Sequence, residues 1–505
     1  MSRKPWVLGL VVALVVLAGG GLALRQLVSG PEEGFLTARG TELYLDGRPF
    51  RAAGSNSYWP AFAPAPVVDR IFDAAAENHF TVMRMWAFND IGDPADPSTS
   101  VDPQNTSTYF QYWDGSGPAR NEGENGLVRL DYAVWSAKQR GIRLVLPLVN
   151  NWGAFGGMDQ YVRWAGLDDH GAFYTDPRIR RWYKDWVSQL LERVNTYTGV
   201  RYKDEPTIAL WELANEPRCD GSPLYPSRDC STETILAWVE EMAAHVKSID
   251  RKHLVGLGDE GFFCREGAGH WTYDCSSGQD ADALARVADL DVVGMHVYPD
   301  HWGTDADWSR QWILDHVALA EEVGKPVVIG EYGWRGVEPR NVVFHDWISA
   351  FEEAGGDLAL HWWLQVRDDT SVPNDTDGFT VYCPSAVCTQ VRYRSIGMAT
   401  GRRDLPPVPE NDTVLTSADG VTEADLLAND VSLYDSLDPA SIDLDPGTPG
   451  AQQRLELPEG VVEVRDGVLR LTGRVDRTVR LAYLVADSQG RVSEQPATVK
   501  LLPPP

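Results

Sequence analysis

The chain has 505 residues, a length that suggests two domains. Its formal net charge of −28 argues against nucleic acids and anionic membrane surfaces as partners, because like charges repel. The 19 tryptophans are many for this length. We expect about half of them in the core, and exposed tryptophans commonly form the walls of binding clefts.

The N-terminus carries an export signal, because Arg3 and Lys4 precede an apolar run over residues 6–24. Residues 1–30 are interpreted in two ways. They form a cleaved signal peptide, with Gly21-Leu22-Ala23 as the cleavage site, or an uncleaved anchor, since about 17–25 apolar residues span a bilayer. In the second case residues 6–24 tether the protein to the membrane. Both interpretations place the remainder outside the cell.

Eight apolar runs with strand character follow a predicted hairpin over residues 41–51, whose turn is Asp46-Gly47. Helical patterns alternate with the runs, which argues for a parallel sheet covered on both faces. Eight repeats over roughly 350 residues predict an α/β fold, a (β/α)8 TIM barrel. The runs are 50–54, 81–85, 143–148, 207–213, 254–258, 292–297, 327–331 and 358–363; the helices are 67–78, 130–139, 179–195, 234–249, 307–322 and 342–353.

A linker over residues 402–409 separates the predicted catalytic domain, residues 31–404, from residues 405–505. The second part has no Trp or Cys, and short alternating segments predict a small all-β sandwich. It resembles the immunoglobulin-like or cadherin-like modules of exported bacterial enzymes, and we interpret it as a spacer or stabilising module. Its predicted strands are 460–464, 468–472, 478–485 and 497–501.

Polar residues occur where the predicted barrel strands end, which is where this fold places its active site. Asn215 and Glu216 follow the fourth run, and Glu331 ends the seventh. Burying an acid is costly unless it has a task or a partner. Two carboxylates at one barrel mouth suit glycoside hydrolysis, which needs an acid and a second carboxylate at the anomeric carbon. Glu212 should lie deeper, as the partner of a buried cation.

Several motifs in order resemble the endo-β-1,4-mannanases of glycoside hydrolase family 5, in the branch that includes fungal and plant enzymes. The resemblance extends from about residue 36 to residue 400. It is carried by Gly54-Ser55-Asn56-Ser57-Tyr58-Trp59, by Arg84-Met85-Trp86-Ala87-Phe88-Asn89-Asp90, by Trp211–Arg218, by Gly258-Asp259-Glu260-Gly261, by His296–Trp302 and by Gly330-Glu331-Tyr332-Gly333.

The resemblance implies a retaining double displacement, in which Glu331 is the nucleophile and Glu216 acts first as acid and then as base. Glu216 should keep its proton while Arg84 holds Glu331 ionised. Of the neighbours Trp362 and Trp363, strand alternation should send only Trp363 into the mouth, as the stacking floor. The resemblance further implies that Asn215 bonds the sugar 2-hydroxyl, Tyr298 bonds the nucleophile, His296 lines the pocket and Arg218 contacts leaving-group sugars. Candidate walls of the cleft are Tyr58, Trp59, Trp152 and Trp302.

The six cysteines fall into three close pairs, and an exported chain favours their oxidation. We therefore predict the disulfides Cys219–Cys230, Cys264–Cys275 and Cys383–Cys388 in preference to a zinc site. No other metal-ligand pattern is evident, so neither a metal nor a cofactor is expected. We expect a monomer.

Two alternatives remain open. The first is another endo-glycanase of the same family, such as a cellulase; Arg218 and residues 296–302 favour mannan. The second is a non-catalytic surface receptor for polysaccharides, against which the joint presence of Glu216, Glu331, Arg84 and Asn215 argues.

Overall fold

The computed structural model describes residues 33–504 except 221–223, 266, 268 and 367–376. The predicted export segment over residues 6–24 lies outside the described residues. Among the helices of the described part, none has both the length and the apolar character that crossing a bilayer requires.

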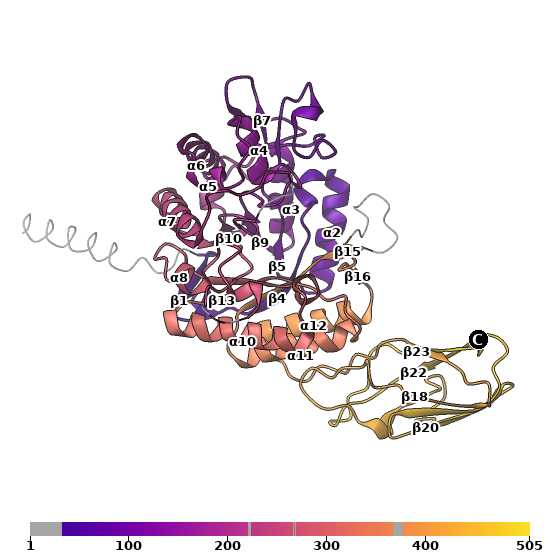
Figure 1. Ribbon diagram of the computed structural model, residues 1–505. Helices are drawn as coiled ribbons and strands as arrows, with labels where there is room; N and C mark the ends of the chain where they lie inside the picture. Colours follow the sequence, from indigo (N-terminus) through magenta and orange to yellow (C-terminus); the bar gives the residue numbers. More distant parts are fainter. Residues whose placement is uncertain (1–32, 221–223, 266, 268, 367–376, 505) are drawn as a thin grey trace, which may run out of the picture.

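Eight parallel strands form the barrel, in the order β11-β10-β9-β5-β4-β14-β13-β12, and all eight lie on the predicted runs. β11 and β12 close the ring by two backbone hydrogen bonds, from Asp291 to Val255 (2.8 Å) and from His296 to Glu260 (3.3 Å). The predicted (β/α)8 barrel is confirmed (Figure 1). The strands are β4 (Ala52–Asn56), β5 (Val82–Arg84), β9 (Arg143–Pro147), β10 (Ile208–Glu212), β11 (Leu254–Gly256), β12 (Val293–Val297), β13 (Val327–Tyr332) and β14 (Leu358–His361).

Long helices surround the strands, and the six predicted ones are present. The apolar pattern does not predict α12, because its buried face carries Gln390, Arg394 and Ser395. Four short helices in the loops were also not predicted: α4 (Gly157–Trp164), α5 (Ala172–Thr175), α8 (Ala281–Leu284) and α9 (Pro299–Trp302). The long helices are α2 (Ala65–Glu77), α3 (Leu127–Gln139), α6 (Pro177–Leu191), α7 (Thr232–Ile249), α10 (Ala306–Val323), α11 (Arg340–Glu353) and α12 (Ala386–Thr400).

The N-terminal hairpin fills one end of the barrel. β1 (Leu36–Arg39), β2 (Glu42–Leu45) and β3 (Arg48–Pro49) form an antiparallel sheet, and its turn places Asp46 and Gly47 at positive φ, as predicted. Leu36 and Leu43 pack with apolar residues of the barrel strands in one buried cluster. Because the hairpin covers the amino-terminal end, the carboxyl ends of the strands form the open mouth.

The C-terminal part forms two small sheets, β17-β23-β22 and β18-β21-β20-β19. Apolar side chains between them, including Leu426, Val462, Leu469 and Val499, form a separate core, which confirms the predicted all-β sandwich. Its strands are β17 (Asp412–Leu415), β18 (Val421–Asp425), β19 (Arg454–Leu457), β20 (Gly460–Arg465), β21 (Val468–Gly473), β22 (Val479–Tyr483) and β23 (Ala497–Leu502).

The sandwich contacts the barrel beside α11 and α12 (Figure 1). Glu352 of α11 is buried and accepts hydrogen bonds from Arg394 (2.8 Å) and, from the C-terminal part, Tyr434 (3.4 Å); Arg403 forms an ion pair with it at 2.6 Å. Tyr393, Leu405 and other apolar residues pack around this network. The contact therefore combines an apolar cluster with a buried charge network.

We expect Glu352→Ala to lower the free energy of unfolding by about 3–5 kcal/mol, because it leaves the buried Arg394 guanidinium without its counter-charge. Guanidinium denaturation of the full chain measures the effect. Glu423→Ala is the control, since it removes an exposed partner of Arg470 and should cost less than about 1 kcal/mol. Equal losses in the two variants would contradict the importance of this network.

Candidate active site

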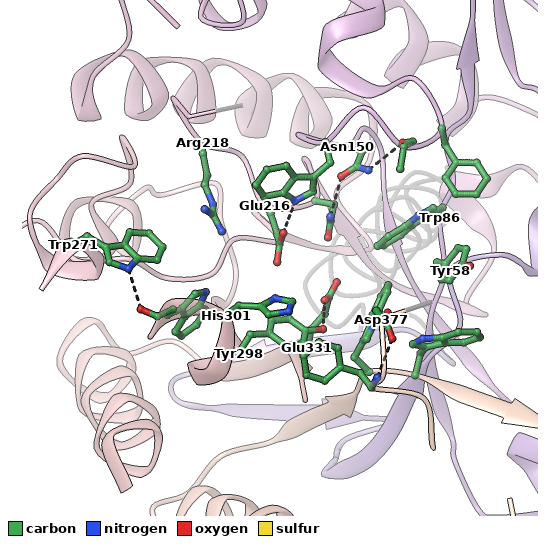
Figure 2. A pocket seen from close by; sticks show the side chains of 18 residues that line it. Tyr58, Trp86, Asn150, Glu216, Arg218, Trp271, Tyr298, His301, Glu331 and Asp377 are labelled. Atoms are coloured by element: carbon green, nitrogen blue, oxygen red, sulfur yellow. Dashed lines mark hydrogen bonds between the residues drawn. The ribbon is translucent and has the colours of Figure 1, made fainter. Parts of the chain in front are cut away.

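A cavity of about 570 Å³ opens at the carboxyl ends of the barrel strands and contains both predicted carboxylates. Figure 2 shows Glu216 and Glu331 in its centre, with Arg218 and Trp271 on one side and Tyr58 and Trp86 on the other. Aromatic side chains form most of the walls. They are Tyr58, Trp86, Trp152, Phe155, Trp271, Tyr298, Trp302, Trp362, Trp363 and Phe379.

Glu216 lies four residues beyond the end of β10, where Pro217 prevents the strand from continuing. Its backbone adopts φ +52°, which is unusual for a residue other than glycine. The carboxylate has two partners: Trp152 Nε1 donates to Oε2 at 2.5 Å, and His296 Nδ1 lies 2.9 Å from Oε1. The carboxylate is therefore fixed in orientation while it faces the cavity.

Glu331 belongs to β13, and it is held by two donors. Arg84 Nη1 donates to Oε1, and the Tyr298 hydroxyl donates to Oε2 at 2.6 Å. Arg84 itself is fully buried and also donates to Glu212 (2.7 Å) and to Asn215 Oδ1 (2.8 Å). The prediction that Glu212 pairs with a buried cation is confirmed.

His296 lies between the two carboxylates. Its Nδ1 is 2.9 Å from Glu216 Oε1 and 3.8 Å from Glu331 Oε2, and the ring is fully buried. Burial lowers the pKa of His296, but the neighbouring charges of Glu331 and Glu216 outweigh burial and raise it above its ordinary value. The raised pKa therefore favours the protonated ring at hydrogen-bonding distance from Glu216.

This arrangement changes the expected proton distribution. Burial raises the pKa of the Glu331 carboxyl, although His296 and Arg84 both favour its charged form. Burial also opposes ionisation of Glu216, but the His296 hydrogen bond and charge outweigh it and lower its pKa to about 2. These shifts favour His296 over Glu216 as the place of the proton in the substrate-free site, and the expectation that Glu216 keeps its proton stays a prediction. The strand pattern contains no information on the His296–Glu216 contact.

Arg218 lies beside the cavity, enclosed by the faces of Trp152, Phe262 and Trp271 at 4.8–5.7 Å from their ring centres. Its Nε donates to Glu260 Oε1 at 2.5 Å. Burial raises the pKa of Glu260 to about 7 even though the charge of Arg218 lowers it. Glu260 is thus a buried partner of Arg218 and does not line the cavity.

Two residues that were predicted to line the cavity do not do so: His296, whose ring is fully buried, and Trp59. Asn215, Trp152 and Trp302 line it. Trp59 does not: it is 3% exposed and packs into the barrel core, because the chain turns into a short helix over Pro60–Phe62 directly after it. Its neighbour Tyr58 lines the cavity instead.

Trp362 and Trp363 both line the cavity, so the prediction that only Trp363 does so is wrong. β14 ends at His361, and strand alternation therefore does not extend to these two residues. Trp362 donates its indole N–H to Asp377 at 2.7 Å and stacks against Tyr58 at 5.8 Å.

Sequence reasoning missed several lining residues. Trp86 lies two residues after Arg84 in the motif over residues 84–90, so its position could have indicated that it lines the cavity. His301 likewise lies inside the motif His296–Trp302. No local pattern indicated that Trp271, Phe155 or Asp377 would line the cavity, because their positions depend on distant contacts.

The cysteines are joined in the same three pairs that we predicted. Cys219–Cys230 begins directly after Arg218, and Cys264–Cys275 encloses the loop that carries Trp271. Two of the three disulfides therefore restrain loops beside the cavity.

One group of residues has the geometry to hold a metal ion. Ligand atoms of Glu216, His296 and Glu331 lie within 4.8 Å of one another. All three are engaged with each other or with Arg84, Trp152 and Tyr298, and the adjacent guanidinium opposes a further cation. The arrangement has the composition expected for acid–base and nucleophilic chemistry.

Comparisons with known proteins agree with this geometry. The family model described as GH family 5 beta-mannosidase-like matches residues 33–341. The mannan endo-1,4-beta-mannosidase A of Podospora anserina is 35% identical over 390 residues, which cover 76% of this chain and 93% of the relative.

Two solved structures extend the comparison. The endo-1,4-beta-mannanase from Rhizomucor miehei has a TM-score of 0.67 at 35% identity and covers 72% of this chain and 99% of its own. The endo-beta-1,4-mannanase from Thermotoga petrophila has a TM-score of 0.66 at 30% identity and covers 91% of this chain and 99% of its own.

We expect His296→Ala to raise the pKa of Glu216 above about 2, because burial then acts without the hydrogen bond and charge that offset it. Carbon-13 NMR titration of the glutamate carboxyl groups measures this change. In the control Tyr298→Phe, Glu331 loses a hydroxyl donor that lowers its pKa, so only the pKa of Glu331 should rise. An unchanged Glu216 titration in His296→Ala would disprove the assignment.

Proposed function

The chain belongs to glycoside hydrolase family 5, and from this premise we propose that it hydrolyses internal β-1,4-mannosidic bonds in mannan, galactomannan or glucomannan with retention of anomeric configuration. One observation carries the proposal: carboxylate oxygens of Glu216 and Glu331 lie within 4.8 Å of each other. Retaining enzymes separate their carboxyl groups by about 5–5.5 Å, whereas inverting enzymes need about 6.5–9.5 Å to admit a water.

The substrate class is supported by the cavity and by the relatives. Aromatic faces and few free charges in the walls suit a neutral polysaccharide, on whose sugar rings aromatic side chains stack. The relatives from Podospora anserina and Rhizomucor miehei are named mannan-degrading enzymes. A cellulase-like specificity is the second candidate, because the same carboxylate pair serves either sugar.

In the first step, Glu331 attacks the anomeric carbon. Arg84 and Tyr298 hold its two oxygens, so the attacking group is oriented before substrate binds. The leaving oxygen needs a proton from Glu216. His296 supplies it across 2.9 Å, from Nδ1 to Oε1, as charge develops on the leaving oxygen.

In the second step, Glu216 acts as the base. Once Glu331 is esterified to the sugar, Glu216 has passed its proton to the leaving oxygen and His296 is neutral. The Glu216 carboxylate then takes a proton from the water that attacks the anomeric carbon, and transfer of that proton to His296 Nδ1 restores the starting state. The hydrogen bond from Trp152 to Oε2 keeps the carboxylate in place through both steps.

The sugar contacts follow from the lining residues. Asn215 is oriented by Arg84 and also donates to Asn150 Oδ1 at 3.0 Å, which suits a bond to the sugar 2-hydroxyl. Trp363 forms the floor beside Glu331. Arg218, with Trp152 and Trp302, binds the leaving-group sugars.

We further propose that residues 31–404 form the catalytic domain and residues 405–505 a linker and stabilising module. Three disulfides support a place of action outside the cytosol, where cysteines are oxidised.

We expect the purified protein to release reducing sugar from β-1,4-mannan and much less from a soluble cellulose derivative. Glu331→Ala should lose at least about 10⁴-fold in kcat, because no nucleophile remains. Glu353→Ala, which changes an exposed glutamate of α11, should retain activity. Preferred cleavage of the cellulose derivative would keep the mechanism and overturn the substrate.

Glu216→Ala should distinguish the acid from the nucleophile. Mannosides with an activated aryl leaving group need no proton, so the first step should persist while the second slows, and a covalent intermediate should accumulate on Glu331. Mass spectrometry of the peptide that contains Glu331 detects this intermediate. Added azide should restore turnover and give a β-configured azide; an α-configured product would disprove retention.

A further inference from the structure

Three fully buried polar side chains form a hydrogen-bonded chain beneath the segment that carries Glu216. His170 Nδ1 lies 2.7 Å from Asp159 Oδ1, and His170 Nε2 lies 3.0 Å from Asn151 Oδ1. The same Asn151 oxygen accepts the backbone N–H of Arg218 at 3.0 Å. The chain thus connects α4, which contains Asp159, with the backbone two residues beyond Glu216.

These contacts determine the charge of His170. The Arg218 N–H fixes which end of the Asn151 amide faces the ring, because only the carbonyl oxygen can accept from it. That oxygen can only accept from His170 Nε2 as well. With Asp159 ionised, its carboxylate accepts from Nδ1. Both ring nitrogens then donate, and His170 is a buried imidazolium balanced by Asp159.

The backbone that this chain holds is under strain. Glu216 has φ +52°, a conformation that is unfavourable for a non-glycine residue and persists only when its surroundings fix it. Pro217 has no N–H to contribute, so the next backbone donor is that of Arg218, which Asn151 binds. Trp152, the residue after Asn151, donates to the Glu216 carboxylate. Asn151 therefore affects both the backbone and the carboxylate of the acid.

We propose that Asp159, His170 and Asn151 are positioning residues for the reaction: the cationic ring holds Asn151, and Asn151 holds the Glu216 segment and Trp152 in their productive places. This inference rests on the proposed function. None of the three side chains lines the cavity, so they act on Glu216 only through the contacts described.

The barrel offers a matched control in a second buried histidine. His253 Nδ1 lies 2.6 Å from Asp250 Oδ2, and its Nε2 lies 3.0 Å from the Glu205 carbonyl oxygen. It is 2% exposed and packs against Phe35, beside the N-terminal hairpin and away from the cavity. The same pairing is present there, and it contacts β10 at Trp211 without a hydrogen bond to the segment that follows the strand and carries Glu216.

The experiment compares His170→Asn with His253→Asn on the full chain. Both should lower the melting temperature, but only His170→Asn should lower kcat on mannan, by about 10–100-fold, with a smaller change in KM, because a small displacement of the acid has this effect. If the two variants keep similar kcat values, the positioning role is wrong.

A second measurement keeps the inference testable even if His170→Asn fails to fold. Nitrogen-15 NMR of the histidine rings should show a doubly protonated His170 in the wild type and a neutral ring in Asp159→Asn, with kcat reduced in that variant. A neutral ring in the wild type would overturn the inference. A wild type that is inactive on mannan would overturn the proposed function, whereas an active wild type with unaffected variants would overturn this inference alone.

Discussion

The arrangement of the site depends on one buried cation. Arg84 has no exposed surface, and its guanidinium donates to Glu212, Glu331, Asn215 and Asn56. A charge this deep is tolerated only where counter-charges and hydrogen bonds compensate for lost hydration. The compensating groups come from β4, β10, β13 and the segment after β10. The hydrogen bonds and ion pairs of the Arg84 guanidinium therefore fix the relative positions of the residues that would carry out the chemistry.

The need to compensate buried charges also explains the position of His296. Two carboxylates a few ångströms apart repel each other, and burial adds to the cost of ionising both. A protonated ring between Glu216 and Glu331 would relieve both costs, since its Nδ1 lies near both carboxylates. In the proposed mechanism the acid is then a pair of groups, Glu216 with His296, whose proton belongs to the pair.

The barrel strands and the disulfide-restrained loops supply different parts of the site. Glu331 and its donors Arg84 and Tyr298 lie on or directly after barrel strands, whereas most aromatic walls come from the segments that follow the strands. Cys219–Cys230 and Cys264–Cys275 restrain two of these loops, and the enclosure of Arg218 by Trp152 and Trp271 joins loops from different repeats. The strands thus position the two carboxylates, while the segments that connect them supply the aromatic walls of the cavity.

Local sequence determined the eight strands, most long helices and the two carboxylates, because apolar runs report burial and an acid at the end of such a run is conspicuous. Side chains alternate between the two faces of a strand, so Glu212, four residues before Glu216, was expected on the same side but deeper in the barrel. Tertiary structure alone decided that Trp362 as well as Trp363 lines the cavity, that Trp59 is core, and that His296 lies within hydrogen-bonding distance of Glu216. Those outcomes depend on contacts between segments far apart in the chain, which no local periodicity encodes.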